Sequence, residues 1–333
     1  MTAPSSERFL VTGAYGCIGA WTVRRLLDED AAVRCVDVGS SSHRLRYLLS
    51  PDELDALEVA NVDITDESEV DELFAAWKPT NVIHLAALQV PFCKGDPRLG
   101  ARVNVVGTVN LFEAAKRIGL PTPLLYASSV ATYDIVDGAE LAPATPSGVP
   151  TTLYGVYKLA NEGTARVYWN DDEVASLGLR PYVVYGVGRD QGLTAEPTMA
   201  MLDATLGRDA SISYGGRNQL QYADDVAAAF IAATRSGHRG ATVLNLPGES
   251  ISMPELADVI RRAARERIEI STGDEPLPYP DAVESSGFAT IVGATQITPI
   301  EDGVRATMER FRALAGRRLV VDTRARRADE GSR

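Results

Sequence analysis

The first half of the chain alternates between short apolar runs and amphipathic segments. Apolar runs bounded by Gly, Pro or polar residues are typical of buried strands, and they occupy 8–13, 32–38, 57–64, 81–87 and 123–129. Apolar residues recur at helical spacing in the segments at 17–29, 66–77, 97–119 and 152–170. Strands that alternate with helices predict a parallel sheet covered on both faces.

The pattern becomes less regular in the second half. A further strand is expected at 179–186, and the segment after residue 187 reads as a loop rich in Gly and polar residues. A helix at 222–234, a strand near 241–248 and a helix beginning near Ser252 or Met253 follow. We expect an α/β protein with a Rossmann-type doubly wound parallel sheet and a smaller C-terminal substrate-binding cap. We expect the sheet domain at 1–187, with 219–250 returning to the sheet. We expect the cap at 188–218 and 251–316, and a disordered tail at 317–333.

Composition narrows the possible partners. The 333 residues are 45% hydrophobic and 23% charged, as in ordinary soluble globular proteins, and the net charge of −12 disfavours a nucleic-acid partner. The three cysteines lack paired spacing, and the three histidines have no Cys or His neighbours at metal-ligand spacing, so neither a disulfide framework nor a metal site is indicated. His84 lies in an apolar run and favours a hydrogen-bonded core histidine. No segment has the length and apolar character of a membrane span, so we expect a cytoplasmic protein without membrane contact.

The turn after the first expected strand carries three glycines. Gly13, Gly16 and Gly19 have the spacing GxxGxxG, which lets the backbone approach a pyrophosphate at the start of the next helix. A tight strand–helix turn is the alternative reading of the triplet alone. Asp37 ends the second expected strand, where a carboxylate can accept hydrogen bonds from both hydroxyls of an adenosine ribose and would repel the extra phosphate of NADP. We therefore expect NAD as the cofactor.

The stretch LYGVYKLANE at 153–162 places a tyrosine one helical turn before a lysine. Tyr154 and Lys158 are four residues apart and share one helix face, whereas Tyr157 is rotated away. A nearby ammonium stabilises a phenolate and lowers the pKa of the tyrosine, which can then exchange a proton with an alcohol as hydride is transferred. Ser128 and Ser129 end the fifth expected strand, where a hydroxyl can hold the reacting oxygen. The alternatives are an exposed helix pair for the tyrosine and lysine, and turn caps for the serines.

Together these motifs resemble an extended short-chain dehydrogenase/reductase, of the NAD-dependent epimerase/dehydratase family typified by UDP-galactose 4-epimerase. The resemblance spans about residues 8–250 and rests on the order of the glycine turn, Asp37, HLAA, Asn104, Ser129 and the Tyr154–Lys158 pair. It implies that Ser129, Tyr154 and Lys158 are catalytic, that Lys158 also holds the nicotinamide ribose, and that the protein is a homodimer. The residues implied to contact the cofactor, besides those above, are Cys17, Ile18, Asp63, Ile64, Leu85, Ala86, Ala87, Asn104 and Tyr182.

The chain departs from the family's pattern at positions that recognise the substrate. Val183 stands where nucleotide-sugar members carry an asparagine, and Asn218 stands where many carry an arginine that reaches a substrate phosphate. The adjacent Arg217 could take that role. Val130 and Ala131 replace the Asp-Glu pair of dehydratase members, which disfavours dehydration. These departures disfavour a nucleoside-diphosphate sugar as the substrate.

The favoured function is therefore an NAD-dependent oxidoreductase that acts on a secondary alcohol or ketone of a sugar, sugar acid or similar small polar substrate. A sugar or nucleotide-sugar epimerase is the alternative, because it needs the same catalytic set, and a catalytically silent NAD-sensing or scaffold protein is a minor third. Ser128, Ser129, Val183 and Arg189 are the candidate substrate-binding residues. Further candidates are Gln191 and Thr194, which lie in the same loop as Arg189, and the rim residues at 92–94. The competing interpretation of the residues in the Arg189 loop is that they are ordinary loop residues.

Overall fold

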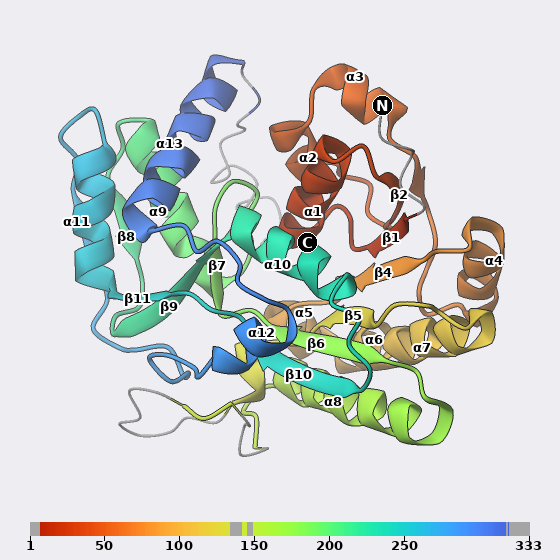
Figure 1. Ribbon diagram of the computed structural model, residues 1–333. Coiled ribbons are helices and arrows are strands. Elements are labelled where there is room, and N and C mark those ends of the chain that lie inside the picture. Colours follow the sequence, from red (N-terminus) through yellow and green to blue (C-terminus); the bar gives the residue numbers. More distant parts are fainter. Residues whose placement is uncertain (1–6, 134–141, 145–148, 318, 320–333) are drawn as a thin grey trace.

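The core of the protein is a seven-stranded parallel sheet (Figure 1). The computed structural model describes residues 7–133, 142–144, 149–317 and 319. The strands follow one another across the sheet in the order β10-β6-β5-β4-β1-β2-β3. Their bounds are β1 Arg8–Thr12, β2 Ala32–Val36, β3 Val59–Ala60, β4 Asn81–His84, β5 Leu124–Ala127, β6 Ser176–Arg180 and β10 Ala241–Asn245. The expected Rossmann-type doubly wound fold is confirmed, although the run at 57–64 yields only the two-residue strand β3.

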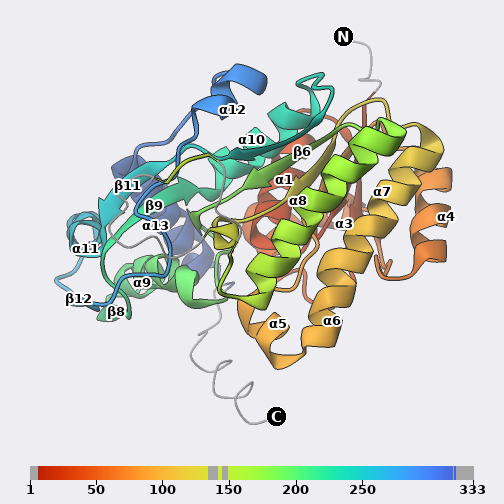
Figure 2. The ribbon, with the colours of Figure 1, turned by 90° about the horizontal axis from the view of Figure 1, so that it is seen from below.

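Helices cover both faces of this sheet. The helices α4, α7 and α8 lie on one face, and α1 and α10 pack together on the other (Figures 1 and 2). Their bounds are α1 Cys17–Asp28, α4 Glu67–Trp77, α7 Gly107–Ile118, α8 Leu153–Asp172 and α10 Ala223–Thr234. The chain order reverses between β1 and β4, so a crevice is expected at the carboxyl ends of these two strands.

Shorter helices lie in the connections after β2 and β4, where α2 packs against α1 and α5 and α6 pack against α8. They are α2 His43–Leu48, α3 Pro51–Ala56, α5 Val90–Gly95 and α6 Pro97–Ala101, and a π-helical turn at Arg102–Val106 joins α6 to α7. The single helix expected at 97–119 is therefore an α-helix interrupted by a π turn. A π turn within a helix is often found at a functional site.

The expected strand at 179–186 is divided between two sheets. β6 ends at Arg180, and β7 (Val183–Tyr185) pairs instead with β9 (Arg217–Tyr222) in a three-stranded sheet with β11 (Glu249–Ser252). Pro181 lies at the break, and since proline has no N–H to give to a sheet, it favours such an interruption. The chain therefore leaves the parallel sheet directly after β6.

Most of the remaining helices and strands lie beside the three-stranded sheet, whereas α12 packs against β10 (Figure 1). They are α9 Glu196–Thr205, β8 Ala210–Ile212, α11 Met253–Ala263, β12 Ile270–Thr272, α12 Ser286–Ile291 and α13 Ile300–Gly316. The loop expected after residue 187 ends at α9, which has Pro197 in its first turn. Apart from residues 317 and 319, the tail expected to be disordered at 317–333 lies outside the described residues.

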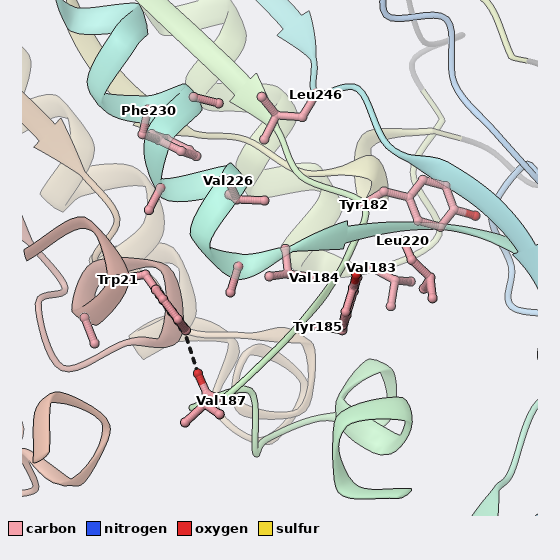
Figure 3. Close-up of a cluster of buried hydrophobic side chains, with 14 of the residues drawn as sticks. Trp21, Tyr182, Val183, Val184, Tyr185, Val187, Leu220, Val226, Phe230 and Leu246 are labelled. Atoms are coloured by element: carbon pink, nitrogen blue, oxygen red, sulfur yellow. Dashed lines mark hydrogen bonds between the residues drawn. The ribbon is translucent and has the colours of Figure 1, made fainter. Parts of the chain in front are cut away.

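A buried cluster joins the two parts of the chain (Figure 3). Trp21 of α1 donates its indole N–H to the carbonyl oxygen of Val187 at 2.9 Å, just after β7. The Trp21 ring also meets Tyr222 edge-on, with centroids 5.8 Å apart. Val226 and Phe230 of α10 belong to the same cluster. The loop after β7 is therefore anchored directly to the first helix of the parallel sheet. Within the described residues, no helix combines the length and apolar character needed to cross a membrane.

Candidate active site

In the turn after β1, the positions of Gly13 and Gly19 have no room for a side chain. Gly13 has φ +72°, and a Cβ atom there would lie 2.6 Å from the backbone nitrogen of Ala86. A Cβ atom on Gly19 would lie 2.2 Å from the carbonyl oxygen of Gly13. α1 begins at Cys17, and no side chain caps its N-terminus at Gly16, so the first N–H groups of the helix remain available to an anion. The turn fits the pyrophosphate of a dinucleotide.

Asp37 lies at the carboxyl end of β2, beside this turn. One carboxylate oxygen accepts a hydrogen bond from the backbone N–H of Tyr15 at 2.9 Å, and the other accepts one from Gly39 at 2.8 Å. These two bonds fix the carboxylate and leave lone pairs for further donors. The arrangement suits the ribose hydroxyls of NAD, as the sequence predicts.

A cluster of charges ties α2 to the loop after β7. Asp190 accepts hydrogen bonds from Nε2 of His43 at 2.6 Å and from Nη2 of Arg44 at 2.5 Å. Arg44 also donates to the carbonyl oxygen of Tyr15 at 2.9 Å. Burial raises the pKa of Asp190, but the bonds from His43 and Arg44 outweigh it and hold the pKa below its ordinary value. Sequence reasoning missed this cluster because its members are about 146 residues apart and carry no local signal.

The predicted catalytic residues meet at the start of α8. Thr152 caps this helix by accepting from the N–H of Gly155, which sets Tyr154 in its first turn. Tyr154 is hydrogen-bonded to Ser129, and the ammonium of Lys158 lies 5.5 Å from the centre of its ring. Tyr157 points elsewhere and donates to the carbonyl oxygen of Pro97 at 2.9 Å. The structure thus brings together the tyrosine that helical spacing selects, its lysine and its serine.

Burial dominates the electrostatics of this group. It raises the pKa of Tyr154 to about 12, although the hydrogen bond from Ser129 and the charge of Arg189 act in the opposite direction. It also lowers the pKa of Lys158, which is buried and donates to the carbonyl oxygen of Ala127 at 2.7 Å, to about 8. The expected lowering of the tyrosine pKa by the lysine is therefore not seen in the protein alone, because desolvation of the phenol is the larger effect.

Ser128 and Ser129 have different surroundings. Ser128 is buried and donates to a carboxylate oxygen of Glu162 at 2.5 Å. The same carboxylate forms a buried ion pair with Arg180 at 2.6 Å. The hydroxyl of Ser128 is thus engaged within the fold, which leaves Ser129 as the serine beside Tyr154. Sequence reasoning missed Glu162, although its position one helical turn after Lys158 was a usable signal.

Asn104 lies in the π-helical turn and holds the loop after β4. Its side-chain oxygen accepts from the N–H of Leu88 at 2.9 Å, and its amide nitrogen donates to the carbonyl oxygen of Leu88 at 3.0 Å and to the sulfur of Cys93 at 3.1 Å. Leu85 and Ala86 in this loop donate their backbone N–H groups to the hydroxyl of Thr12. Asn104 therefore shapes the segment that passes next to Gly13.

His84 is a hydrogen-bonded core residue, as the sequence predicts. Its ring nitrogens lie 2.7 Å from the hydroxyl of Thr12 and 3.0 Å from that of Thr108. Burial, with a smaller effect from the charge of Lys158, lowers the pKa of His84 to about 3. The histidine is thus neutral and connects β1, β4 and α7 beneath the site. No group of three or more potential metal-ligating side chains occurs in the part of the chain that the structure describes.

Asp63, Ile64 and Cys17 are further residues that the resemblance implies to contact the cofactor, and the structure shows their local contacts. Asp63 accepts from the N–H of Thr65 at 2.9 Å. Ile64 is buried beside Gly107, where an added Cβ atom would lie 2.6 Å from its side chain. The sulfur of Cys17 lies 4.0 Å from the carbonyl oxygen of Val187.

Tyr182 and Val183 lie in the part of the chain that packs against the cap. The hydroxyl of Tyr182 donates to the carbonyl oxygen of Pro280, and its ring meets Tyr279 edge-on at 6.2 Å. Val183 is 1% exposed and pairs with Leu220 in the small sheet. The phenol of Tyr279 also acts to raise the pKa of Tyr154. Sequence reasoning missed Tyr279, which no local pattern marks.

Asn218 and the adjacent Arg217 have different surroundings in β9. Asn218 is buried and donates to the carbonyl oxygen of Gly215 at 3.3 Å. Arg217 donates to the carboxylate of Glu255 at 3.1 Å and to the carbonyl oxygen of Ser250 at 3.0 Å, on the exposed side of β9. The guanidinium of Arg217 is thus engaged with neighbouring cap residues, and its suggested phosphate-binding role stays a prediction.

Comparison with known proteins identifies the family. Residues 9–246 match the NAD dependent epimerase/dehydratase family. A UDP-glucose 4-epimerase of Mycolicibacterium smegmatis is 30% identical over 317 residues, which cover 92% of this chain and 98% of that protein. A probable UDP-glucuronate 4-epimerase of Rhizobium meliloti is 28% identical, and the match covers 84% of this chain and 81% of that protein.

Solved structures agree with this match. The UDP-glucose 4-epimerase of Thermus thermophilus, solved with NAD, superposes with a TM-score of 0.78 at 25% identity, over 92% of this chain and 99% of that one. The L-threonine dehydrogenase of Clostridium difficile shares the fold, with a TM-score of 0.77 at 20% identity over 92% and 97% of the two chains. The chain belongs to the NAD-dependent epimerase/dehydratase family and is an NAD-dependent enzyme.

Proposed function

We propose that the protein is an NAD-dependent oxidoreductase that transfers a hydride to or from a secondary alcohol or ketone of a sugar, sugar acid or similar small polar substrate. The observation that carries the proposal is the group formed by Ser129, Tyr154 and Lys158 at the carboxyl edge of the parallel sheet. The glycine turn, where the dinucleotide fits, follows β1 at the same edge of the sheet.

Residues of this chain transfer the proton to and from the substrate. Ser129 holds the substrate oxygen beside Tyr154, whose phenolic oxygen takes the proton from an alcohol or returns it to a ketone. NAD, when bound, supplies the hydride acceptor and a positive nicotinamide ring. Lys158, with a pKa of about 8, carries its charge at neutral pH, and this charge favours the phenolate once the substrate site is filled. The proton transfer therefore depends on two cations, Lys158 and the nicotinamide, to offset the burial of the phenol.

A sugar epimerase is the second candidate. The relative from Mycolicibacterium smegmatis, a UDP-glucose 4-epimerase matched over 98% of its length, favours it. Val183 and Asn218, which stand where nucleotide-sugar members carry an asparagine and an arginine, are both buried, and this favours a substrate without a nucleoside diphosphate. A dehydrogenase reduces added NAD+ in step with its substrate, whereas an epimerase converts its substrate with no net change in NADH absorbance.

Replacement of Tyr154 by Phe tests the proposal. We expect turnover to fall by at least about 10³-fold, because the acid/base is lost, while the Kd for NAD+ stays unchanged. The measurement is NADH absorbance with a panel of sugars, sugar acids and nucleotide sugars, together with chromatography of the products. Tyr157→Phe is the matched control on the same helix and retains turnover. Full activity of the Tyr154→Phe protein, or a loss shared equally by Tyr157→Phe, would rule out the assignment.

A further inference from the structure

Glu162 is a buried carboxylate on α8, two helical turns after Tyr154. Its side chain is 8% exposed, and it accepts a hydrogen bond from the hydroxyl of Ser128, just after β5, at 2.5 Å. Arg180, at the end of β6, donates Nε to one of its oxygens at 2.7 Å and Nη2 to the other at 2.6 Å. One carboxylate thus connects α8 to the ends of two neighbouring strands of the parallel sheet.

The face of α8 that carries the catalytic residues meets three consecutive residues at the end of β5. The contacts pair Tyr154 with Ser129, Lys158 with the carbonyl oxygen of Ala127 at 2.7 Å, and Glu162 with Ser128 at 2.5 Å. Residues four apart lie on the same face of a helix, so the three side chains approach the end of the strand from one side. Glu162 makes the contact that is farthest along α8 from the reacting phenol.

The position of Ser129 is set by β6. The backbone N–H groups of its two neighbours, Ser128 and Val130, donate to the carbonyl oxygens of Leu179 at 2.7 Å and Pro181 at 3.0 Å. These bonds lie on both sides of Ser129 and hold it to the strand that carries Arg180. The ion pair between Arg180 and Glu162 then holds α8 to the same strand.

The first turn of α8 packs directly against the backbone that follows Ser129. A Cβ atom on Gly155, the residue after Tyr154, would lie 2.0 Å from the carbonyl oxygen of Ala131. The helix therefore approaches this backbone as closely as a glycine allows. A shift of α8 along or away from the strand end would change the distance between the phenol of Tyr154 and the hydroxyl of Ser129.

Proton transfer requires the groups to lie within hydrogen-bond reach, about 2.6–3.2 Å, and an error of about 1 Å can lower the rate about 100-fold. We propose that Glu162 is a positioning residue, whose carboxylate joins α8 to Ser128 and Arg180 and so holds Tyr154 in place beside Ser129. This inference rests on the proposed function and adds a residue that acts through its neighbours rather than at the reacting atoms.

A purely structural ion pair is the competing interpretation. A buried ion pair often adds little net stability compared with apolar residues of similar volume, whereas it does hold one geometry. The bond from Ser128 is the observation that favours positioning, because Arg180 already neutralises the carboxylate and the hydroxyl adds a third bond next to Ser129. Arg180 also donates to the carbonyl oxygen of Ala144 at 2.8 Å, so the tests change Glu162 and Ser128 instead.

Steady-state kinetics, with the substrate found in the panel described above, tests the positioning role. We expect Ser128→Ala to lower kcat about tenfold and Glu162→Gln about 10- to 100-fold, with the KM and the Kd for NAD+ changed less than about twofold. The double variant should resemble Glu162→Gln, because both changes remove the same bond. Glu113→Gln is the matched control, since Glu113 of α7 accepts from the hydroxyl of Tyr168 on α8 at 2.6 Å, and it should keep kcat. Urea unfolding gives the folded fraction to which each kcat is referred.

Lysine titration by NMR gives a readout that needs no substrate. The chain has only 4 lysines, so selective labelling at the ε-carbon gives few signals, and the signal lost in Lys158→Met identifies Lys158. Burial lowers the pKa of Lys158 to about 8, while Cys93 and Glu162 act to raise it. We therefore expect a lower pKa in Glu162→Gln and an unchanged pKa in the other two single variants. Tyr154 and His84, the other titratable groups beside Lys158, are the same in all of these proteins.

Two kinds of kinetic result would overturn the inference. An unchanged kcat in Glu162→Gln, or an equal loss in Glu113→Gln, would leave Glu162 with a structural role. A raised KM at normal kcat in Ser128→Ala would place Ser128 in substrate binding, and losses that multiply in the double variant would show that the two residues act independently. An unchanged pKa of Lys158 in Glu162→Gln would also contradict the arrangement. If Glu162→Gln does not fold, Ser128→Ala decides, because it keeps the ion pair.

The proposed function fails by a different observation. Normal turnover by Tyr154→Phe would refute the acid/base assignment, and the positioning role with it. An inactive Tyr154→Phe protein together with normal kcat in Ser128→Ala and Glu162→Gln would refute the positioning role alone.

Discussion

The parallel sheet and the cap place their functional groups in different ways. In the sheet, the groups follow directly from regular elements: Gly13 comes after β1, Asp37 after β2, Ser129 shortly after β5, and Tyr154 lies in the first turn of α8. In the cap, Arg189 and Tyr279 lie in loops, and long-range contacts such as the bond between Tyr182 and Pro280 hold these loops in place. The groups of the sheet are thus placed by the ends of regular elements, whereas those of the cap are placed by loops that long-range contacts hold.

This difference predicts how the two regions respond to change. A substitution in the sheet should act on cofactor affinity or on the stability of the whole fold, because its strands pair with one another along their length. A substitution in a cap loop should act on the Michaelis constant of the substrate, with a smaller effect on stability. The three predictions below test this separation, from the largest expected effect to the smallest.

Gly13→Ala should have the largest effect. The new methyl group would lie 2.6 Å from the backbone of Ala86, in a residue with φ +72°. We expect the free energy of unfolding to fall by about 3 kcal/mol and the Kd for NAD+ to rise at least about 30-fold. Gly119→Ala is the matched control, because Gly119 has φ +60° with nothing within 4 Å of an added Cβ, and it should lose about 1 kcal/mol with normal NAD+ affinity. Urea unfolding and fluorescence titration measure both quantities, and equal losses in the two variants would contradict the steric argument.

Acid should destabilise the sheet through His84. Its pKa is about 3 in the folded protein and near 6.5 when unfolded, so the unfolded chain binds the proton more strongly below pH 6.5. This contribution is therefore lost as the pH falls, by about 2 kcal/mol between pH 7 and pH 5. None of the three histidines lies in the cap segments 188–218 and 251–316. Urea unfolding at both pH values should show a shallower acid dependence for His84→Gln, and an unchanged dependence would contradict the role of His84.

Tyr182→Phe should have the smallest effect and should act on the substrate side. The change removes the hydrogen bond to the carbonyl oxygen of Pro280, next to Tyr279. We expect about 1 kcal/mol less stability and a Michaelis constant raised about threefold to tenfold, with the Kd for NAD+ unchanged. Steady-state kinetics and NAD+ titration measure the two sides separately. A weaker Kd for NAD+ with a normal Michaelis constant would instead support the sequence-based expectation that Tyr182 lies near the cofactor.

The sequence predicted the sheet side well because its signals are local. Apolar runs mark the strands, glycine spacing marks the turn, and helical spacing distinguishes Tyr154 from Tyr157. The break between β6 and β7 was missed, since an apolar run does not show which sheet receives it, although Pro181 was a usable signal. The direction of the Arg217 side chain depends on Glu255, so it could not be inferred before the tertiary contacts were known.

Asp190 has a consequence for protein engineering. Its carboxylate binds His43 and Arg44 of α2, while its backbone belongs to the loop that carries Arg189. A library that varies this loop to change the substrate specificity will therefore also disturb α2 whenever Asp190 is among the varied positions. A library that keeps Asp190, His43 and Arg44 unchanged leaves that connection intact. It then varies only positions whose change should not lower the affinity for the dinucleotide.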